Sequence, residues 1–165
     1  PAFSVRDGFE FYMPETRNGG RWKSIWPAFE RIAIELSDSG ANGNVLKLSR
    51  MMKHWKRHKS VNLKSFAIDL LVAKFFDEYK NKLQSYFYYD WFVRDFLKYL
   101  ILQSNSLLYS PGSDEYINMG SQWLPDAKNA LKKAEEACDL EYQDCPTLAG
   151  IEWVEMFGGR IPTSV

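Results

Sequence analysis

The chain has 165 residues, of which 45% are hydrophobic, and its 21 Lys and Arg balance 21 Asp and Glu, so the formal net charge is zero. This length suits a single domain with its own core, and two cysteines are too few for a disulfide framework. No apolar run approaches the about 20 residues that cross a bilayer, and the first residues lack the basic-then-apolar pattern of a signal peptide. We therefore expect a reducing, cytoplasmic setting.

The N-terminal residues predict a β-hairpin. Apolar residues alternate on both sides of Asp7-Gly8, a dipeptide that favours the tight turn of a hairpin. Pro14 is expected to end the second strand, and "ETRNGGRWKSIW" is expected to form a loop. Because the chain opens on strand-like residues without a Met, we expect that it continues from a missing part. The predicted division is a hairpin and loop over residues 1–26 and a helical domain over residues 27–165.

The helical domain is predicted from apolar residues that recur at i, i+3, i+4 and i+7. In its first helix, one apolar face is formed by Phe29, Ile32, Ala33 and Leu36. The stretch "SPGSDEYINMGSQWLPD" is expected to be a long, turn-rich loop. The predicted fold class is therefore mainly α, a helical bundle domain with a short N-terminal β-hairpin. The predicted helices span about 27–36, 45–58, 66–76, 85–103, 126–144 and 147–157.

The helix expected over residues 45–58 has one apolar face and one basic face. No acid occurs between Asp38 and Asp69, so nothing in the sequence nearby offsets this charge. The next helix, over residues 66–76, is apolar nearly all round, which is typical of a central buried helix. The basic stripe is formed by Lys47, Arg50, Lys53, His54 and Arg57.

The start of the buried helix is a candidate anion site. A helix N-terminus presents free N–H groups and the positive end of a dipole, both of which favour phosphate. Ser65 adds a hydroxyl as the expected cap, Lys64 adds a charge, and Lys53 reaches the same place if the two helices pack antiparallel. Phe66 offers a ring face to a base. In the alternative interpretation, Ser65 is only a cap, Phe66 belongs to the core and the bases are a solvated face.

Other chemistry has weaker support in the sequence. His54 and His58 have the i, i+4 spacing of a metal-binding pair, but no Glu lies between them as in HExxH, and their neighbours are cationic. Cys138 falls on the buried stripe of its helix and is expected to be inert packing. The acids of "GSDEY", residues 112–116, lie in a predicted turn. We assign no catalytic residue and no metal ligand to this chain.

Two motifs resemble a known family. "RMMKHW" (residues 50–55) and "KSFAIDLL" (residues 64–71) are similar to the C-terminal helical, oligoadenylate-synthetase-like domain of the cGAS/DncV-like nucleotidyltransferases (CD-NTases). Those proteins have a "(K/R)-x-x-K-x-W" helix and then "(K)-S-(F/Y)-x-(I/L)-(E/D)-L-L". The resemblance extends over nearly the whole chain, because "PAF" at Pro1, "YMPET" (residues 12–16) and "WVEMFGGRIP" (residues 153–162) follow the family's order.

The resemblance implies a function for the basic stripe. The helical domain of such an enzyme closes one side of a cleft over nucleoside triphosphates, where Lys53 and Ser65 would contact phosphates, with Lys64 as a weaker candidate, and Phe66 would lie against a base. The family's "GS" turn and D-x-D metal ligands belong upstream of Pro1 and are absent from this sequence. Mg²⁺ or Mn²⁺ is therefore expected in the missing N-terminal nucleotidyltransferase core, within a larger α/β enzyme, and none in this chain.

The function expected from this resemblance is that of the nucleotide-binding half of an enzyme that makes cyclic di- or oligonucleotide second messengers from nucleoside triphosphates. The setting implied is bacterial anti-phage, CBASS-like defence, with possible regulatory protein partners and no membrane. Whether the chain alone is an enzyme is left open. The alternatives are a non-enzymatic nucleic-acid-binding module that uses the basic stripe over residues 47–64 on phosphate backbones, and a plain scaffold domain.

Overall fold

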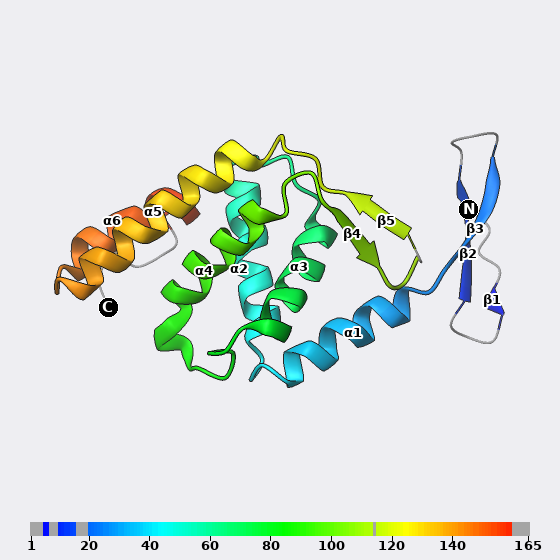
Figure 1. Ribbon diagram of the computed structural model, residues 1–165, viewed down its shortest axis with the longest axis horizontal. Coiled ribbons are helices and arrows are strands. Elements are labelled where there is room, and N and C mark those ends of the chain that lie inside the picture. The colour runs from blue at the N-terminus through cyan, green and yellow to red at the C-terminus, as the bar shows by residue number, and fades with distance from the viewer. Residues whose placement is uncertain (1–4, 7–9, 16–19, 114, 160–165) are drawn as a thin grey trace.

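The computed structural model describes residues 5–6, 10–15, 20–113 and 115–159. Within these residues there are six α-helices. The three-stranded N-terminal sheet lies at one end of the molecule and helices α5 and α6 lie at the other (Figure 1). The predicted fold class, a mainly helical domain with an N-terminal hairpin, is confirmed. No helix in the described part of the chain is both long and apolar enough to cross a membrane.

The core is built around α3 (Ser65–Glu78), which packs against both α2 (Asn44–His58) and α4 (Tyr89–Leu102). Its side chains are buried on nearly every side, as the all-round apolar sequence predicts. The apolar face of α2 is buried as well, with Trp55 only 1% exposed. The basic side of α2 is therefore the side left for solvent and ligands.

Helices α5 (Leu124–Tyr142) and α6 (Pro146–Phe157) pack side by side, and α5 also packs against α4 (Figure 1). A 3-10 turn, η1 (Tyr86–Tyr88), leads into α4. Small side chains at the interface let helix backbones approach closely. The sequence predicts a buried stripe along α5 formed by Ala127, Ala130, Leu131, Ala134, Ala137 and Cys138. The structure buries all of these side chains except that of Leu131, which is partly buried.

The N-terminal sheet has three antiparallel strands in the order β1 (Val5–Arg6), β2 (Glu10–Glu15) and β3 (Arg21–Ile25). Arg6 pairs with Glu10, which confirms the predicted hairpin, although Asp7-Gly8 lies outside the described residues. The prediction of a loop after the hairpin is wrong for Arg21–Ile25, which form strand β3.

The prediction that Pro14 ends the second strand is also wrong. Pro14 pairs with Trp22 inside the β2–β3 ladder. The described part of β1 pairs only with Glu10 and Phe11 of β2, so no described strand pairs with Pro14 on that side, where a residue without an N–H is tolerated.

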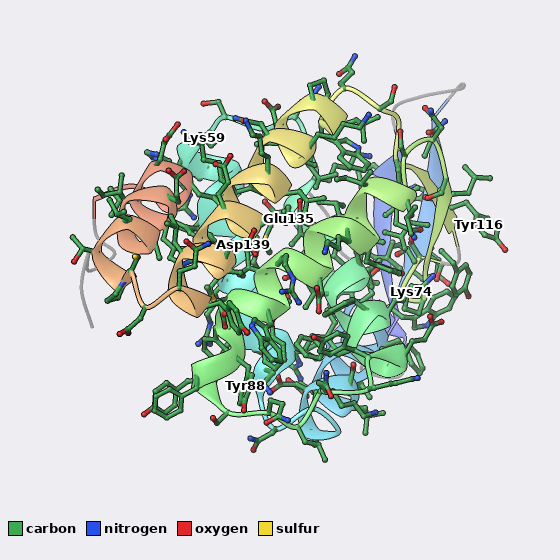
Figure 2. All side chains as sticks on the ribbon, turned by 60° about the vertical axis from the view of Figure 1, so that its left-hand side comes forward. Lys59, Lys74, Tyr88, Tyr116, Glu135 and Asp139 are labelled. Atoms are coloured by element: carbon green, nitrogen blue, oxygen red, sulfur yellow. The ribbon has the colours of Figure 1, made fainter. Side chains whose placement is uncertain are left out.

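A second hairpin replaces the long loop that the sequence predicts before α5. Strands β4 (Leu107–Ser110) and β5 (Glu115–Asn118) pair antiparallel. The Ser110 hydroxyl donates to Glu30 Oε1 at 2.7 Å, and the Trp26 N–H donates to the Gly112 carbonyl at 2.6 Å. The hairpin is thus attached to the start of α1, while Tyr116 projects outward from β5 (Figure 2).

Helix α1 (Pro27–Ser39) turns its predicted apolar face outward. Phe29 is 53% exposed and Leu36 is 69% exposed. The side of α1 that faces the body includes Ser37, whose hydroxyl donates to the Ala73 carbonyl and to Asp77 of α3. The residues that the pattern groups together do share a face, but that face is not part of the core.

Candidate functional site

A basic cavity of about 580 Å³ lies where α2 ends and α3 begins. Positions 50, 53, 54 and 57 have the i, i+3, i+4, i+7 spacing of one helix face, and position 56 is three residues after position 53, so these side chains project toward the same side of α2. No carboxylate belongs to the lining, which makes the cavity strongly positive. The lining consists of Arg50, Lys53, His54, Lys56, Arg57, Ser60, Val61 and Ser65.

Lys53 is held at the wall of this cavity by an ion pair. Its Nζ lies 2.7 Å from Asp69 Oδ1 and 3.1 Å from Asp69 Oδ2. Asp69 is one turn beyond Ser65 on α3, so the pair joins the two helices beside the helix N-terminus. The Lys53 side chain keeps 33% of its surface exposed. Its ammonium group is therefore oriented and still open to a ligand.

Ser65 lies in the same cavity but does not cap α3. The cap position belongs to Lys64, whose backbone is extended, and Ser65 is the first helical residue. Its hydroxyl instead accepts a hydrogen bond from Lys56 Nζ at 3.1 Å. The prediction of a Ser65 cap is thus wrong, because the helix already begins at Ser65 and no described side chain caps it. Sequence reasoning left Lys56 out of the stripe, although it follows Lys53 at the i+3 spacing that places two residues on one helix face.

The two arginines are less engaged. The guanidinium groups of Arg50 and Arg57 form no hydrogen bond or ion pair with the part of the chain that the structure describes. Each guanidinium offers a planar fork of donors that matches two phosphate oxygens. The cavity therefore combines uncommitted arginines with lysines that are already oriented.

His54 takes part in the packing of α2 against α6. His54 Nε2 donates to the Phe157 carbonyl at the end of α6, at 2.8 Å. No three His, Cys, Asp or Glu side chains of the described residues lie close enough together to hold a metal ion. The family resemblance implies magnesium or manganese in the missing core and none in this chain, and both stay expectations.

Two of the sequence-predicted residues lie away from this cavity. Lys64 is exposed and lines a second cavity of about 330 Å³. Phe66 is half-buried and packs against the hydrophobic core. The structure thus brings Lys53 and Ser65 together and separates them from Lys64 and Phe66, whose roles stay predictions.

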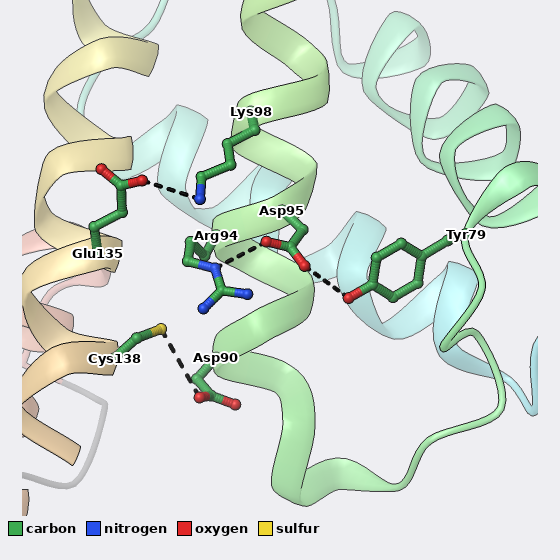
Figure 3. Close-up of polar contacts among 7 residues, drawn as sticks. All are labelled: Tyr79, Asp90, Arg94, Asp95, Lys98, Glu135 and Cys138. Atoms are coloured by element: carbon green, nitrogen blue, oxygen red, sulfur yellow. Dashed lines mark hydrogen bonds and ion pairs between the residues drawn. The ribbon is translucent and has the colours of Figure 1, made fainter. Parts of the chain in front are cut away.

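Another polar network joins α4 to its neighbours (Figure 3). Asp95 accepts hydrogen bonds from Arg94 Nε and from the Tyr79 hydroxyl, both at 2.8 Å. Burial raises the pKa of the Cys138 thiol to about 12. This thiol donates a weak hydrogen bond to Asp90. Burial also raises the pKa of Asp90, to about 6. The pKa of Cys138 agrees with inert packing, since the thiolate is the nucleophilic form.

Comparison with known proteins supports the fold. No protein-family model and no curated protein matches the sequence. A solved structure, that of E. coli MS115-1 CdnC with ATP, matches with a TM-score of 0.71 and 16% identity. The match covers 97% of this chain and 58% of the CdnC chain. The two proteins therefore share a fold over nearly all of this chain, which spans 58% of the length of CdnC.

Proposed function

We propose that this chain is the nucleotide-binding helical half of a nucleotidyltransferase that makes cyclic di- or oligonucleotide second messengers from nucleoside triphosphates. The observation that carries the proposal is the basic cavity, in which Lys53 and Ser65 lie together. The two motifs that resemble the CD-NTase family meet at this cavity. CdnC, which shares the fold and was solved with ATP, is itself a CD-NTase.

The charges of the cavity suit a triphosphate. Four Lys and Arg side chains line it, and among the described residues the only acid that forms an ion pair with one of them is Asp69, outside the lining. Hydrogen bonds between charged groups and phosphate are the strong ones, and an arginine fork fixes the orientation of the group that it binds. Ser65 and the N-terminus of α3 add neutral donors. We propose that Arg50 and Arg57 join Lys53 and Ser65 in holding the phosphates.

Catalysis is proposed for a part of the enzyme outside this chain. The described residues offer no cluster of metal-binding side chains, and this chain spans 58% of CdnC. Mg²⁺ or Mn²⁺ and the catalytic carboxylates would belong to the nucleotidyltransferase core. By the same resemblance, we propose that the enzyme acts in the bacterial cytoplasm in anti-phage defence.

The first test is ATP binding by the chain and by Lys53→Ala. A charge-assisted hydrogen bond contributes about 1.5–3 kcal/mol, so we expect ATP affinity to fall about 10- to 150-fold in calorimetric titrations. Lys98→Ala is the matched control, because Lys98 forms a similar ion pair with Glu135 outside the cavity. Equal affinities for ATP in all three proteins would show that the basic cavity is not the nucleotide site.

A nucleic-acid-binding function is the second candidate, and the uncommitted Arg50 and Arg57 favour it. A surface that binds phosphate backbones loses affinity steeply as salt rises, with a slope set by the number of phosphate contacts. Single-stranded RNA and ATP should therefore be titrated side by side at two salt concentrations. Tight RNA binding with a steep salt slope, together with weak ATP binding, would favour this second function.

A further inference from the structure

The connection from α2 to α3 separates two cavities. Ser60, Val61 and Ser65 line the basic cavity, whereas Asn62 and Lys64 line the second one, of about 330 Å³. Because Lys64 and Ser65 are consecutive, the two cavities flank the first turn of α3. Neighbouring residues thus line both cavities, as a ligand with two chemically different parts would require.

The second cavity has an apolar floor. Its buried lining residues, each less than 8% exposed, come from three elements that meet here: the α2–α3 connection, α3 and the segment between β5 and α5. The Trp123 indole N–H donates to the Met119 carbonyl at 2.8 Å, which fixes the largest of these side chains. The floor is formed by Leu63, Ala67, Met119 and Trp123. The floor is therefore closely packed and apolar, which suits contact with a flat apolar face.

The rim of the same cavity is formed by amides. Asn62 Nδ2 donates to Gln122 Oε1, so the two side chains hold each other in place. This leaves Asn62 Oδ1 as an acceptor and Gln122 Nε2 as a donor, neither of them bonded to another described residue. Asn118 Oδ1 accepts from the Gly120 N–H at 2.9 Å, which leaves its amino group available. No carboxylate belongs to the lining.

We propose that this second cavity binds a nucleobase, that of the nucleotide whose phosphates occupy the basic cavity. A nucleobase is flat and apolar on its faces and has donors and acceptors on its edge. An amide donor beside an amide acceptor can read such an edge, as Asn and Gln read adenine. The size of the cavity and its few fixed polar groups are those of a small-molecule site. The inference rests on the proposed function for the class of ligand, and it adds Asn62 and Gln122 as residues that select the base.

The test compares ATP with tripolyphosphate, which has no base. The double variant Asn62→Ala/Gln122→Ala should bind ATP about 5- to 150-fold more weakly than the unaltered chain, the range for losing one good amide–base pair. Its affinity for tripolyphosphate should not change. Both side chains are exposed, so folding should survive, as a melting curve would verify. Gln143→Ala removes an exposed amide outside both cavities and should change neither affinity.

A second measurement needs no variant. In nitrogen-edited NMR spectra, the Trp123 indole N–H should shift when ATP is added and should stay in place with tripolyphosphate. If ATP binds but the double variant keeps its full affinity and Trp123 does not respond, the nucleobase cavity is disproved while the proposed function stands. If neither ATP nor tripolyphosphate binds the unaltered chain, both proposals fail.

Discussion

Single ion pairs and hydrogen bonds determine which side chains of the basic stripe are ready for a ligand. Lys53 is paired with Asp69, and Lys56 with the Ser65 hydroxyl, whereas Arg50 and Arg57 are uncommitted among the described residues. A partly exposed ion pair is worth about 0–1 kcal/mol, so a phosphate competes with Asp69 at little cost. The sequence supplies the charges, but only the contacts show which of them are already oriented.

Asp90 is the residue whose titration should change stability. Its pKa is raised to about 6, first by burial and then by the nearby Glu141, and its Oδ1 has no hydrogen-bond partner within the described structure. A carboxyl group with a raised pKa in the folded state stabilises the fold below its unfolded pKa of 3.8. That contribution is lost as the pH rises through about 6, so the ionised form is destabilising at neutral pH.

Asp90→Asn should therefore stabilise the fold at pH 7.5, by about 1 kcal/mol after allowance for the partial exposure of the group. The gain should shrink toward zero as the pH falls to about 4. Urea unfolding at pH 4, 5.5 and 7.5 measures this, with Asp139→Asn on the outer face of α5 as the control (Figure 2). A gain that is the same at every pH would mean that the charge of Asp90 is not its cause.

Among the elements, α1 and α3 differ in how far their apolar residues are buried. Helix α1 has one apolar face and α3 is apolar nearly all round, and Leu36 of α1 is 69% exposed while Leu71 of α3 is 0% exposed. Helix α3 is covered by α1, α2 and α4, whereas α1 packs on the body from one side only. Burial here depends on position in the bundle and not on the pattern alone.

Leu71→Ala should cost about 2–5 kcal/mol, because it removes buried methyl groups and leaves a cavity in the core. Leu36→Ala should change the free energy of unfolding by no more than about 0.5 kcal/mol, as is usual for an exposed side chain. Unfolding curves of both variants in urea measure the difference. A large loss at Leu36 would mean that the outer face of α1 is covered in solution. Light scattering would then show an assembly whose mass rises with protein concentration.

At the scale of the whole molecule, binding and catalysis should separate. The described residues form a basic cavity but offer no cluster of carboxylates and histidines for a metal ion. We expect that this 165-residue chain binds ATP but, with Mg²⁺ or Mn²⁺ added, releases no pyrophosphate from labelled triphosphates. A heat-treated sample gives the background. Pyrophosphate release above that background, in proportion to the protein added, would contradict this division.

Local patterns predicted much of the fold. The all-round apolar sequence of α3, the two-faced sequence of α2 and the alanine stripe of α5 each describe a helix whose burial follows from its own residues. Strands β3, β4 and β5 were not predicted, because the turn-forming residues beside them, Gly20 before β3 and Pro111-Gly112 between β4 and β5, favour a loop in the sequence. Their strand partners are near in the sequence, since Arg21 pairs with Glu15 and Glu115 pairs with Ser110. The side-chain bond that holds the β4–β5 hairpin, by contrast, joins Ser110 to Glu30 across 80 residues.

The sequence by itself determined the helices, their apolar faces and the stripe of positive charge, because each depends on residues within a few turns of one another. Only the tertiary structure decided that Lys53 and Ser65 line one cavity, that Phe66 packs against the core, and that Asn62 meets Gln122. These are contacts between elements, and their geometry depends on how the helices cross. The second cavity therefore has no signature in the sequence, since its floor and rim come from segments that only folding brings together.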